Sequence, residues 1–308
     1  YVSAWIGFEN RVIINYQLPY FNRSNKWGLD LHAEWAESKN LAVTTRENRL
    51  VYWKGEKSLR TASAYSLDIN YQPQFLKRHQ LSAGFLNYRI SDSVYQENPS
   101  YLGQNLDQAR YPFVEYGYLL DRRNYRGYPT SGYLFGLEAT HYFLKDMGIT
   151  KARIRLNYHR KMGRYHASSQ SLVYLSSSTQ QPYVLQRGFG WQNDLVRGYN
   201  YHVVEGEHYM IQKLSLARKL PSISSYFHWL PQQLKHLSVT PIPKLFFDLG
   251  YVASKQFKSN GNLDNQLLWG TGLGVDLLTY YDSIWRIEYS MNNRKETGLF
   301  LNFTLFIQ

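Results

Sequence analysis

The chain has no cysteine among its 308 residues and no apolar run long enough for a membrane-spanning helix. The missing cysteines exclude a disulfide scaffold. A transmembrane helix needs about 18 or more consecutive apolar residues, and no stretch of the sequence provides them. Aromatic residues are abundant, with 28 Tyr, 15 Phe and 8 Trp. This richness excludes an intrinsically disordered chain, because disordered segments are poor in aromatics.

The motifs of several enzyme classes are also missing. The sequence contains no G-x-S-x-G elbow, no phosphate-binding P-loop and no dinucleotide-binding fingerprint. These motifs therefore provide no candidate for a catalytic residue or a cofactor site. One small cluster of possible metal ligands comprises His202, Glu205, Glu207 and His208. We interpret it as a polar loop and expect no metal.

Positive charge is in excess, with 35 Lys and Arg against 23 Asp and Glu, which gives a net charge of +12. Such a charge suits nucleic acid, anionic lipid headgroups or an acidic substrate. Two basic groups with interleaved tyrosines could form a nucleic-acid patch: Arg122, Arg123 and Arg126, and Arg160, Lys161 and Arg164. At the ends of strands, they fit lipid headgroups or a barrel lumen better, so we expect no nucleic-acid partner.

Apolar and polar residues alternate with a period of two, which is typical of β-strands. In 269–277, for example, Trp269, Leu273 and Leu277 alternate with glycines and Asp276. The pattern predicts about fourteen strands, over residues 1–8, 11–19, 26–37, 62–72, 79–90, 112–122, 132–144, 150–161, 167–178, 208–219, 244–253, 267–278, 283–290 and 297–307. Long polar stretches separate some strands, and short turns join others.

Two all-β architectures fit this alternation. A soluble β-sandwich has strands of about 5–6 residues and buries one face of each sheet in a dry core. Here the predicted strands are nearer ten residues long, as bilayer-crossing strands are, and aromatics gather at strand ends. The inward phase also carries charges such as Asp30, Arg153 and Glu288, which a dry core could not hold. The sequence therefore favours an antiparallel transmembrane β-barrel.

Three short motifs fall at defined places in this barrel. The longest polar stretch, 179–207, contains Val196, Arg197, Gly198 and Tyr199. A later predicted strand places Phe246, Asp248 and Gly250 on its lumen face. A predicted hairpin carries Asp121, Arg122, Pro129 and Gly132. Each motif alone is compatible with an ordinary turn or a solvated charge.

Together, these motifs resemble the BamA/TamA superfamily of outer-membrane barrels, which includes two-partner-secretion translocators. That family carries a VRG[FY] loop motif, an FxDxG strand motif and a D-R…P-x-x-G hairpin, in the order found here. Its C-terminal strand signal is matched at Glu296, Gly298, Leu301 and Phe303. The resemblance covers essentially the whole chain.

The resemblance implies a sixteen-stranded barrel, of which about 14 strands lie in this sequence. Residues 1–308 would form the barrel, with the loop at about 179–207 folded inward. Two first strands and periplasmic POTRA domains would precede Tyr1. The chain would be integral to the outer membrane of a Gram-negative-type bacterium. Arg197 of the loop would contact Asp248 in the lumen. Family members often place a second carboxylate on strand twelve, where this chain is expected to have Ala217.

The resemblance also implies a function, for which we expect no catalytic residue, no cofactor and no enzymatic activity. The leading hypothesis is an assembly factor that inserts and folds barrel clients through a seam between its first and last strands. Its partners would be unfolded outer-membrane clients, the lipid bilayer with its anionic headgroups, and accessory lipoproteins of an assembly complex. One alternative is a two-partner-secretion-type polypeptide translocator. Another is a barrel that anchors an N-terminal enzyme domain.

Overall fold

The computed structural model describes residues 1–145, 147–186, 188–191, 194–226, 236–255, 262–279 and 283–305. Within these residues, one antiparallel sheet has fifteen strands, of which β15 (Ile223–Tyr226) lies off the main path. The other fourteen follow one another in chain order. They are β1 (Val2–Trp5), β2 (Glu9–Leu18), β3 (Trp27–Ser38), β6 (Arg60–Gln74), β7 (Lys77–Ile90), β8 (Gln108–Asp121), β9 (Gly132–Phe143), β10 (Gly148–Met162), β11 (Tyr165–Ser176), β14 (His208–Arg218), β16 (His236–Ala253), β17 (Leu267–Thr279), β18 (Ser283–Asn292) and β19 (Thr297–Leu305). All fourteen predicted strands are present, although residues 306 and 307 of the last prediction lie outside the described ranges.

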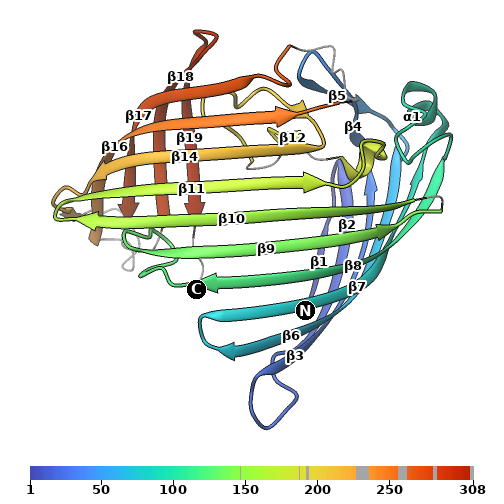
Figure 1. Cartoon of the computed structure of the whole chain (residues 1–308), viewed down its shortest axis with the longest axis horizontal. Coiled ribbons are helices and arrows are strands. Elements are labelled where there is room, and N and C mark those ends of the chain that lie inside the picture. Colours follow the sequence, from blue (N-terminus) through green and yellow to red (C-terminus); the bar gives the residue numbers. More distant parts are fainter. Residues whose placement is uncertain are drawn as a thin grey trace.

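The sheet curves round on itself into a barrel wall, with β1 and β19 at its two ends (Figure 1). Within the described residues, β1 pairs only with β2 and β19 only with β18, so this sheet has two free edges. No helix in the described part of the chain is long and apolar enough to cross a membrane.

The outer face of the sheet is apolar and exposed. Leu245, Leu273 and Leu299 are 63%, 58% and 65% exposed. They belong to one row of cross-strand neighbours, because Leu245 stands opposite Leu273, Leu273 opposite Tyr289, and Tyr289 opposite Leu299. A soluble sandwich would cover such a surface with a second sheet, whereas a barrel in a bilayer presents it to lipid.

The inner face is polar or small. Along β16, Lys244, Phe246, Asp248 and Gly250 are buried, while Leu245 and Phe247 between them are exposed. Successive side chains of a strand point to opposite faces, so this burial pattern sets the lumen phase. The predicted phase of Asp248 was therefore correct.

β16 begins at His236, eight residues earlier than the alternation predicted. Its first part pairs with β15 (Ile223–Tyr226), and its later part pairs with β14 from Lys244 onward. Between these two partners lie Pro241 and Pro243, which have no N–H to donate and therefore tolerate an unpaired edge. The two prolines also hid the strand from the sequence pattern.

Three long connections gather at one end of the barrel (Figure 1). The first forms a hairpin of β4 (Asn40–Arg46) and β5 (Arg49–Lys54), and the second contains α1 (Asp92–Glu97). The third, residues 177–207, contains a 3-10 turn (Tyr183–Leu185) and a ribbon of β12 (Gly188–Phe189) and β13 (Val204–Glu205). The sequence predicted polar loops here but not these elements.

Candidate functional site

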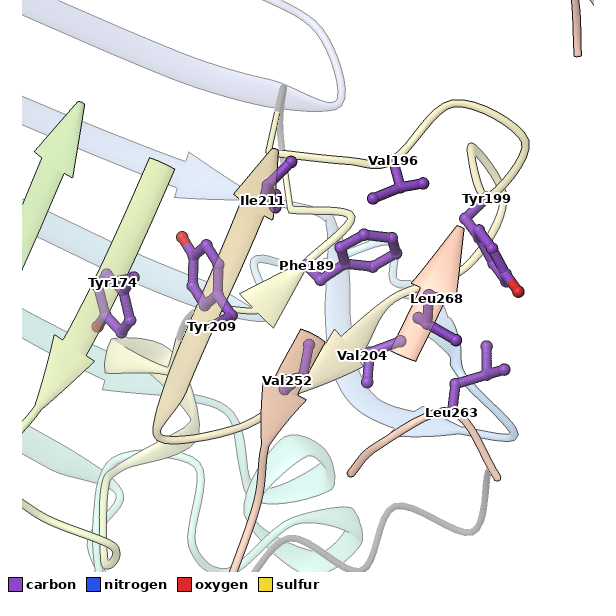
Figure 2. Packing of buried hydrophobic residues seen from close by; sticks show 10 residues of the cluster. All are labelled: Tyr174, Phe189, Val196, Tyr199, Val204, Tyr209, Ile211, Val252, Leu263 and Leu268. Atoms are coloured by element: carbon purple, nitrogen blue, oxygen red, sulfur yellow. The ribbon is translucent and has the colours of Figure 1, made fainter. Parts of the chain in front are cut away.

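The loop of residues 177–207 packs against the inner wall of the barrel. Its apolar side chains Phe189, Val196, Tyr199 and Val204 are fully buried. Figure 2 shows them facing wall residues on β11, β14, β16 and β17. The cluster comprises Tyr174, Phe189, Val196, Tyr199, Val204, Tyr209, Ile211, Val252, Leu263 and Leu268. Apolar burial of this kind offsets the entropy lost when a long loop is ordered.

Arg197 lies at the centre of the site and contacts Asp248. Its Nη2 is 2.5 Å from Asp248 Oδ1, and its Nε is 2.8 Å from Oδ2. The backbone N–H of Arg197 also donates to Oδ2, at 3.1 Å. The guanidinium lies over the Phe246 ring, 3.8 Å from its centroid. Asp248 is completely buried, so this is a charge-assisted, bidentate pair shielded from water.

Glu288 on β18 is a second carboxylate partner of Arg197, with Oε1 3.1 Å from Nη1. Glu288 in turn accepts from Lys244 Nζ at 2.8 Å, and Lys244 also contacts Asp276 at 2.7 Å. Arg286 lies 3.0 Å from Asp276. The sequence placed Glu288 on the lumen face but did not connect it with the loop.

Ala217 was expected at the position of β14 beside the Arg197–Asp248 pair, and this expectation was wrong because the register of β14 differs. The residue of β14 that stands opposite Asp248 is Lys213, and Ala217 stands opposite Lys244. A cation therefore occupies the β14 position beside the Arg197–Asp248 pair. The sequence alone could not give this register, because it does not show how β14 and β16 align along their length.

Glycines allow the loop to come this close to the wall. Gly198 has a φ of +94°, a conformation that side chains rarely adopt. A Cβ on Gly270 of β17 would lie 1.8 Å from the carbonyl oxygen of Arg197. Beyond these glycines, Asn292 Nδ2 donates to the Gly198 carbonyl at 2.8 Å, and Tyr199 Oη donates to Asn293. The VRGY segment is thus held by β16, β17, β18 and the turn after β18.

The hairpin motif lies at the opposite end of the strands. Asp121 pairs with Arg123 at 2.8 Å, whereas the motif residue Arg122 is exposed. Gly132 has a φ of +98°, and a Cβ there would meet the Arg122 carbonyl at 2.1 Å. Pro129 follows Tyr128, whose hydroxyl donates to Asp276 at 3.0 Å. The hairpin therefore reaches the same ion-pair network as the loop.

The C-terminal signal residues lie on the edge strand and its turn. Glu296 precedes β19 and accepts from Asn292 at 2.8 Å. Leu301 and Phe303 are 73% and 54% exposed on the outer face, and Gly298 lies near the start of the strand. Within the described residues, none of the four forms a hydrogen bond or an ion pair with Arg197 or Asp248.

The candidate metal ligands are not brought together. His202 approaches Glu296 at 3.8 Å, Glu205 accepts from Thr45 at 2.6 Å, and Glu207 accepts from the Lys255 N–H at 3.0 Å. His208 faces the Ser176 N–H. Over the residues that the structure describes, no group of three or more His, Asp or Glu is arranged to hold a metal.

The loop also joins the two other long connections into a cap. The N–H of Val203 donates to Asn48 of the β4–β5 turn at 2.7 Å. Thr45 of β4 donates to Glu205 at 2.6 Å. Burial raises the pKa of the Glu205 carboxyl, although the Thr45 hydroxyl opposes this by favouring the charged form. A second apolar cluster beneath the hairpin and α1 includes Val43, Val94, Leu102 and Tyr183.

Comparison with known proteins identifies the fold. The crystal structure of BamA from Haemophilus ducreyi lacking POTRA domains 1–3 matches 97% of this chain, with a TM-score of 0.67 and 11% sequence identity. The chain spans 62% of the length of that BamA structure. LpxR from Salmonella typhimurium also aligns over 97% of the chain, at 8% identity, but its TM-score of 0.23 carries no argument. No family model and no curated protein matches the sequence.

The fold and the site together define a class of protein. The chain is an antiparallel, up-and-down β-barrel sheet similar to the barrel of BamA, with an apolar outer face and a lumen occupied by an inward-folded loop. At this level of identity the likeness shows the fold alone.

Proposed function

We propose that the chain is the barrel of an outer-membrane assembly factor that inserts and folds other β-barrel proteins. Three features support this: a fold similar to the BamA barrel, an outer face suited to lipid, and a lumen filled by a loop held in place by ion pairs. A lumen filled in this way does not suit a simple diffusion pore.

The observation that carries the proposal is the likeness to the BamA barrel over 97% of this chain, and the last strand, β19, is where a client strand would pair. Within the described residues β19 pairs only with β18, over Thr297–Leu305. An unpaired strand edge presents a row of N–H and C=O groups that template pairing with another chain. A client strand that pairs with β19 would begin its own sheet within the bilayer.

Folding of a client in liposomes tests this proposal. The full-length protein is reconstituted, and an outer-membrane barrel unfolded in urea is added. We expect heat-resistant client to form faster than in empty liposomes.

Because the chain has no cysteine, a single introduced thiol can report the client contact. Asn302→Cys on β19 should crosslink to a thiol in the terminal strand of the client. Asn157→Cys on β10 is the matched control, since Asn157 also faces the lumen and β10 is paired on both sides, with β9 and β11. Equal crosslinking from both positions, or no acceleration of folding, contradicts the proposal.

The second candidate is a polypeptide translocator. It is favoured by a lumenal cavity of about 640 Å³ between the hairpin and the loop. A translocator would carry a partner across the liposome membrane to the far compartment, where added protease cannot reach it. An assembly factor would leave its client folded in the bilayer.

A further inference from the structure

The lumenal cavity of about 640 Å³ has one wall that carries no carboxylate. This wall is formed by neighbouring strands β10, β11 and β14. Apart from Ala217, the side chains that it presents to the cavity are hydrogen-bond donors or cations: Asn157, His159, His166, Ser168, Gln170, Lys213 and Ser215. The other sides are formed by the hairpin of residues 122–131, the VRGY loop and strands β16 to β19, which carry the carboxylates Asp276 and Glu288.

Most cations around the cavity are neutralised by carboxylates. Arg123 contacts Asp121, Arg197 contacts Asp248, and Lys244 lies between Asp276 and Glu288. Arg286 also reaches Asp276. These pairs belong to the network already described.

Lys213 differs from these cations. It stands opposite Asp248 in the β14–β16 register, but both carboxylate oxygens of Asp248 accept from Arg197. Among the described residues, the Lys213 amine forms no ion pair or hydrogen bond, although the side chain is partly buried. Asp248, Glu288 and Asp194 attract the ammonium, but among the described residues none of them accepts a hydrogen bond from it. A buried donor without an acceptor is unfavourable, so this position calls for a group that accepts hydrogen bonds.

His159 provides an independent observation on the same wall. The residue is only 5% exposed, and neither Nδ1 nor Nε2 has a hydrogen-bond partner in the described structure. Buried polar atoms are normally paired, so two imidazole nitrogens without a partner indicate a group that this residue would bind. Both nitrogens are covered by surrounding atoms, so the imidazole would turn toward the cavity to reach such a group. His159 and Lys213 both line this cavity.

We propose that this wall binds a phosphate group, with Lys213 as its main cationic contact and His159 as a donor. A phosphate offers oxygens in several directions and accepts many hydrogen bonds at once. That suits donors of three kinds arriving from three strands. The hydroxyls of Ser168 and Ser215, which share a hydrogen bond of 2.6 Å, lie on the same wall. The site goes beyond the proposed assembly function and does not depend on it.

Titration calorimetry of the full-length protein tests the site. The protein is kept in a zwitterionic detergent without phosphate headgroups, at constant ionic strength, and inorganic phosphate is added. We expect saturable binding with one site per chain. A sugar phosphate is compared with the same sugar lacking phosphate. Tighter binding of the sugar phosphate than of phosphate assigns the site to a phosphorylated sugar, whereas equal binding assigns it to free phosphate.

Lys213→Met should weaken phosphate binding about tenfold or more, the change expected when one charge-assisted hydrogen bond is lost. This variant should fold, because Lys213 takes part in no ion pair within the described part of the chain. Lys161→Met is the matched control: Lys161 is exposed, and it does not line the cavity. His159→Leu, which removes two unpaired nitrogens, should also weaken binding while heat-resistant folding is retained.

The proposal is overturned if the folded wild-type protein gives no saturable heat with phosphate, which would leave the cavity to water. It is also overturned if Lys213→Met and Lys161→Met bind phosphate as the wild type does, or lose binding equally. Loss in Lys213→Met and His159→Leu alone supports it.

Discussion

Arg197→Ala should destabilise the barrel more than any other single truncation in the loop. The substitution removes the bidentate contact with Asp248, the contact of 3.1 Å with Glu288, and the packing of the guanidinium on Phe246. Asp248 is completely buried, so its charge is left with one backbone N–H from the loop. Removing one partner of a buried ion pair destabilises a protein by about 3–5 kcal/mol.

The two carboxylates should differ in their coupling to Arg197. Asp248 has two side-chain contacts with it, whereas Glu288 has one and is also held by Lys244 at 2.8 Å. Coupling energies of contacting residues fall within about 0.5–3 kcal/mol, and we expect Asp248 near the upper end and Glu288 near the lower. Arg197→Lys should restore only part of the stability, since an ammonium cannot make the bidentate contact.

The assay is a pair of double-mutant cycles, Arg197→Ala with Asp248→Ala and Arg197→Ala with Glu288→Ala. Unfolding by urea in detergent is followed by the loss of heat-resistant mobility on gels. Limited proteolysis of residues 177–207 reports separately whether the loop leaves the lumen. Phe8→Ala is a suitable control for general damage, because Phe8 is 69% exposed and outside the site.

Strict additivity of Arg197→Ala and Asp248→Ala would refute this reasoning. So would a coupling energy for Glu288 larger than that for Asp248. A loop that stays resistant to protease in Arg197→Ala, with unchanged stability, would show that the apolar cluster alone holds it.

Three further predictions concern the wall, the loop and the cap. Leu67→Arg should destabilise the barrel by about 2–4 kcal/mol in lipid, because Leu67 is 42% exposed on the outer face. Ser66→Arg, at the adjacent lumen-facing position, should have a much smaller effect. The reverse order in urea unfolding would mean that the two faces are exchanged. Gly270→Ala should expel the loop and make it sensitive to protease, because the new Cβ would lie 1.8 Å from the carbonyl oxygen of Arg197. Gly117→Ala is the control and should leave the loop protected, because its Cβ would come no nearer than 3.6 Å to another atom. Equal protection of the loop in the two variants would contradict the close approach. The pKa of Glu205 is raised in the folded state, so its contribution to stability is present below the unfolded pKa and is lost as pH rises through the folded pKa. After correction for intrinsic exchange, hydrogen exchange in the cap should therefore speed up with rising pH more than it does in Glu205→Gln. Identical pH profiles of the two proteins would rule this out.

The period-two alternation was sufficient to predict the strands, because inward and outward side chains of a barrel wall differ in chemistry along every strand. It placed all fourteen strands and the lumen phase of Asp248. It failed where the chemistry does not alternate, as at the start of β16, which contains Pro241 and Pro243. It also missed the β4–β5 hairpin, which packs against other loops and not against lipid or lumen.

The motif order led to the prediction that Arg197 approaches Asp248, and the structure places them together. The further partners of Arg197 were decided only by tertiary structure. Glu288 reaches the loop because β17 and β18 follow β16 round the wall, and Lys213 stands beside Asp248 because of the register between β14 and β16. A strand pattern fixes which face a side chain takes, but a shift of two residues keeps that face and changes every neighbour. The sequence by itself therefore determined the strands of the wall and which of its faces is apolar. The cross-strand register and the docking of the loop decided which charges meet, and where the unpaired Lys213 and His159 lie.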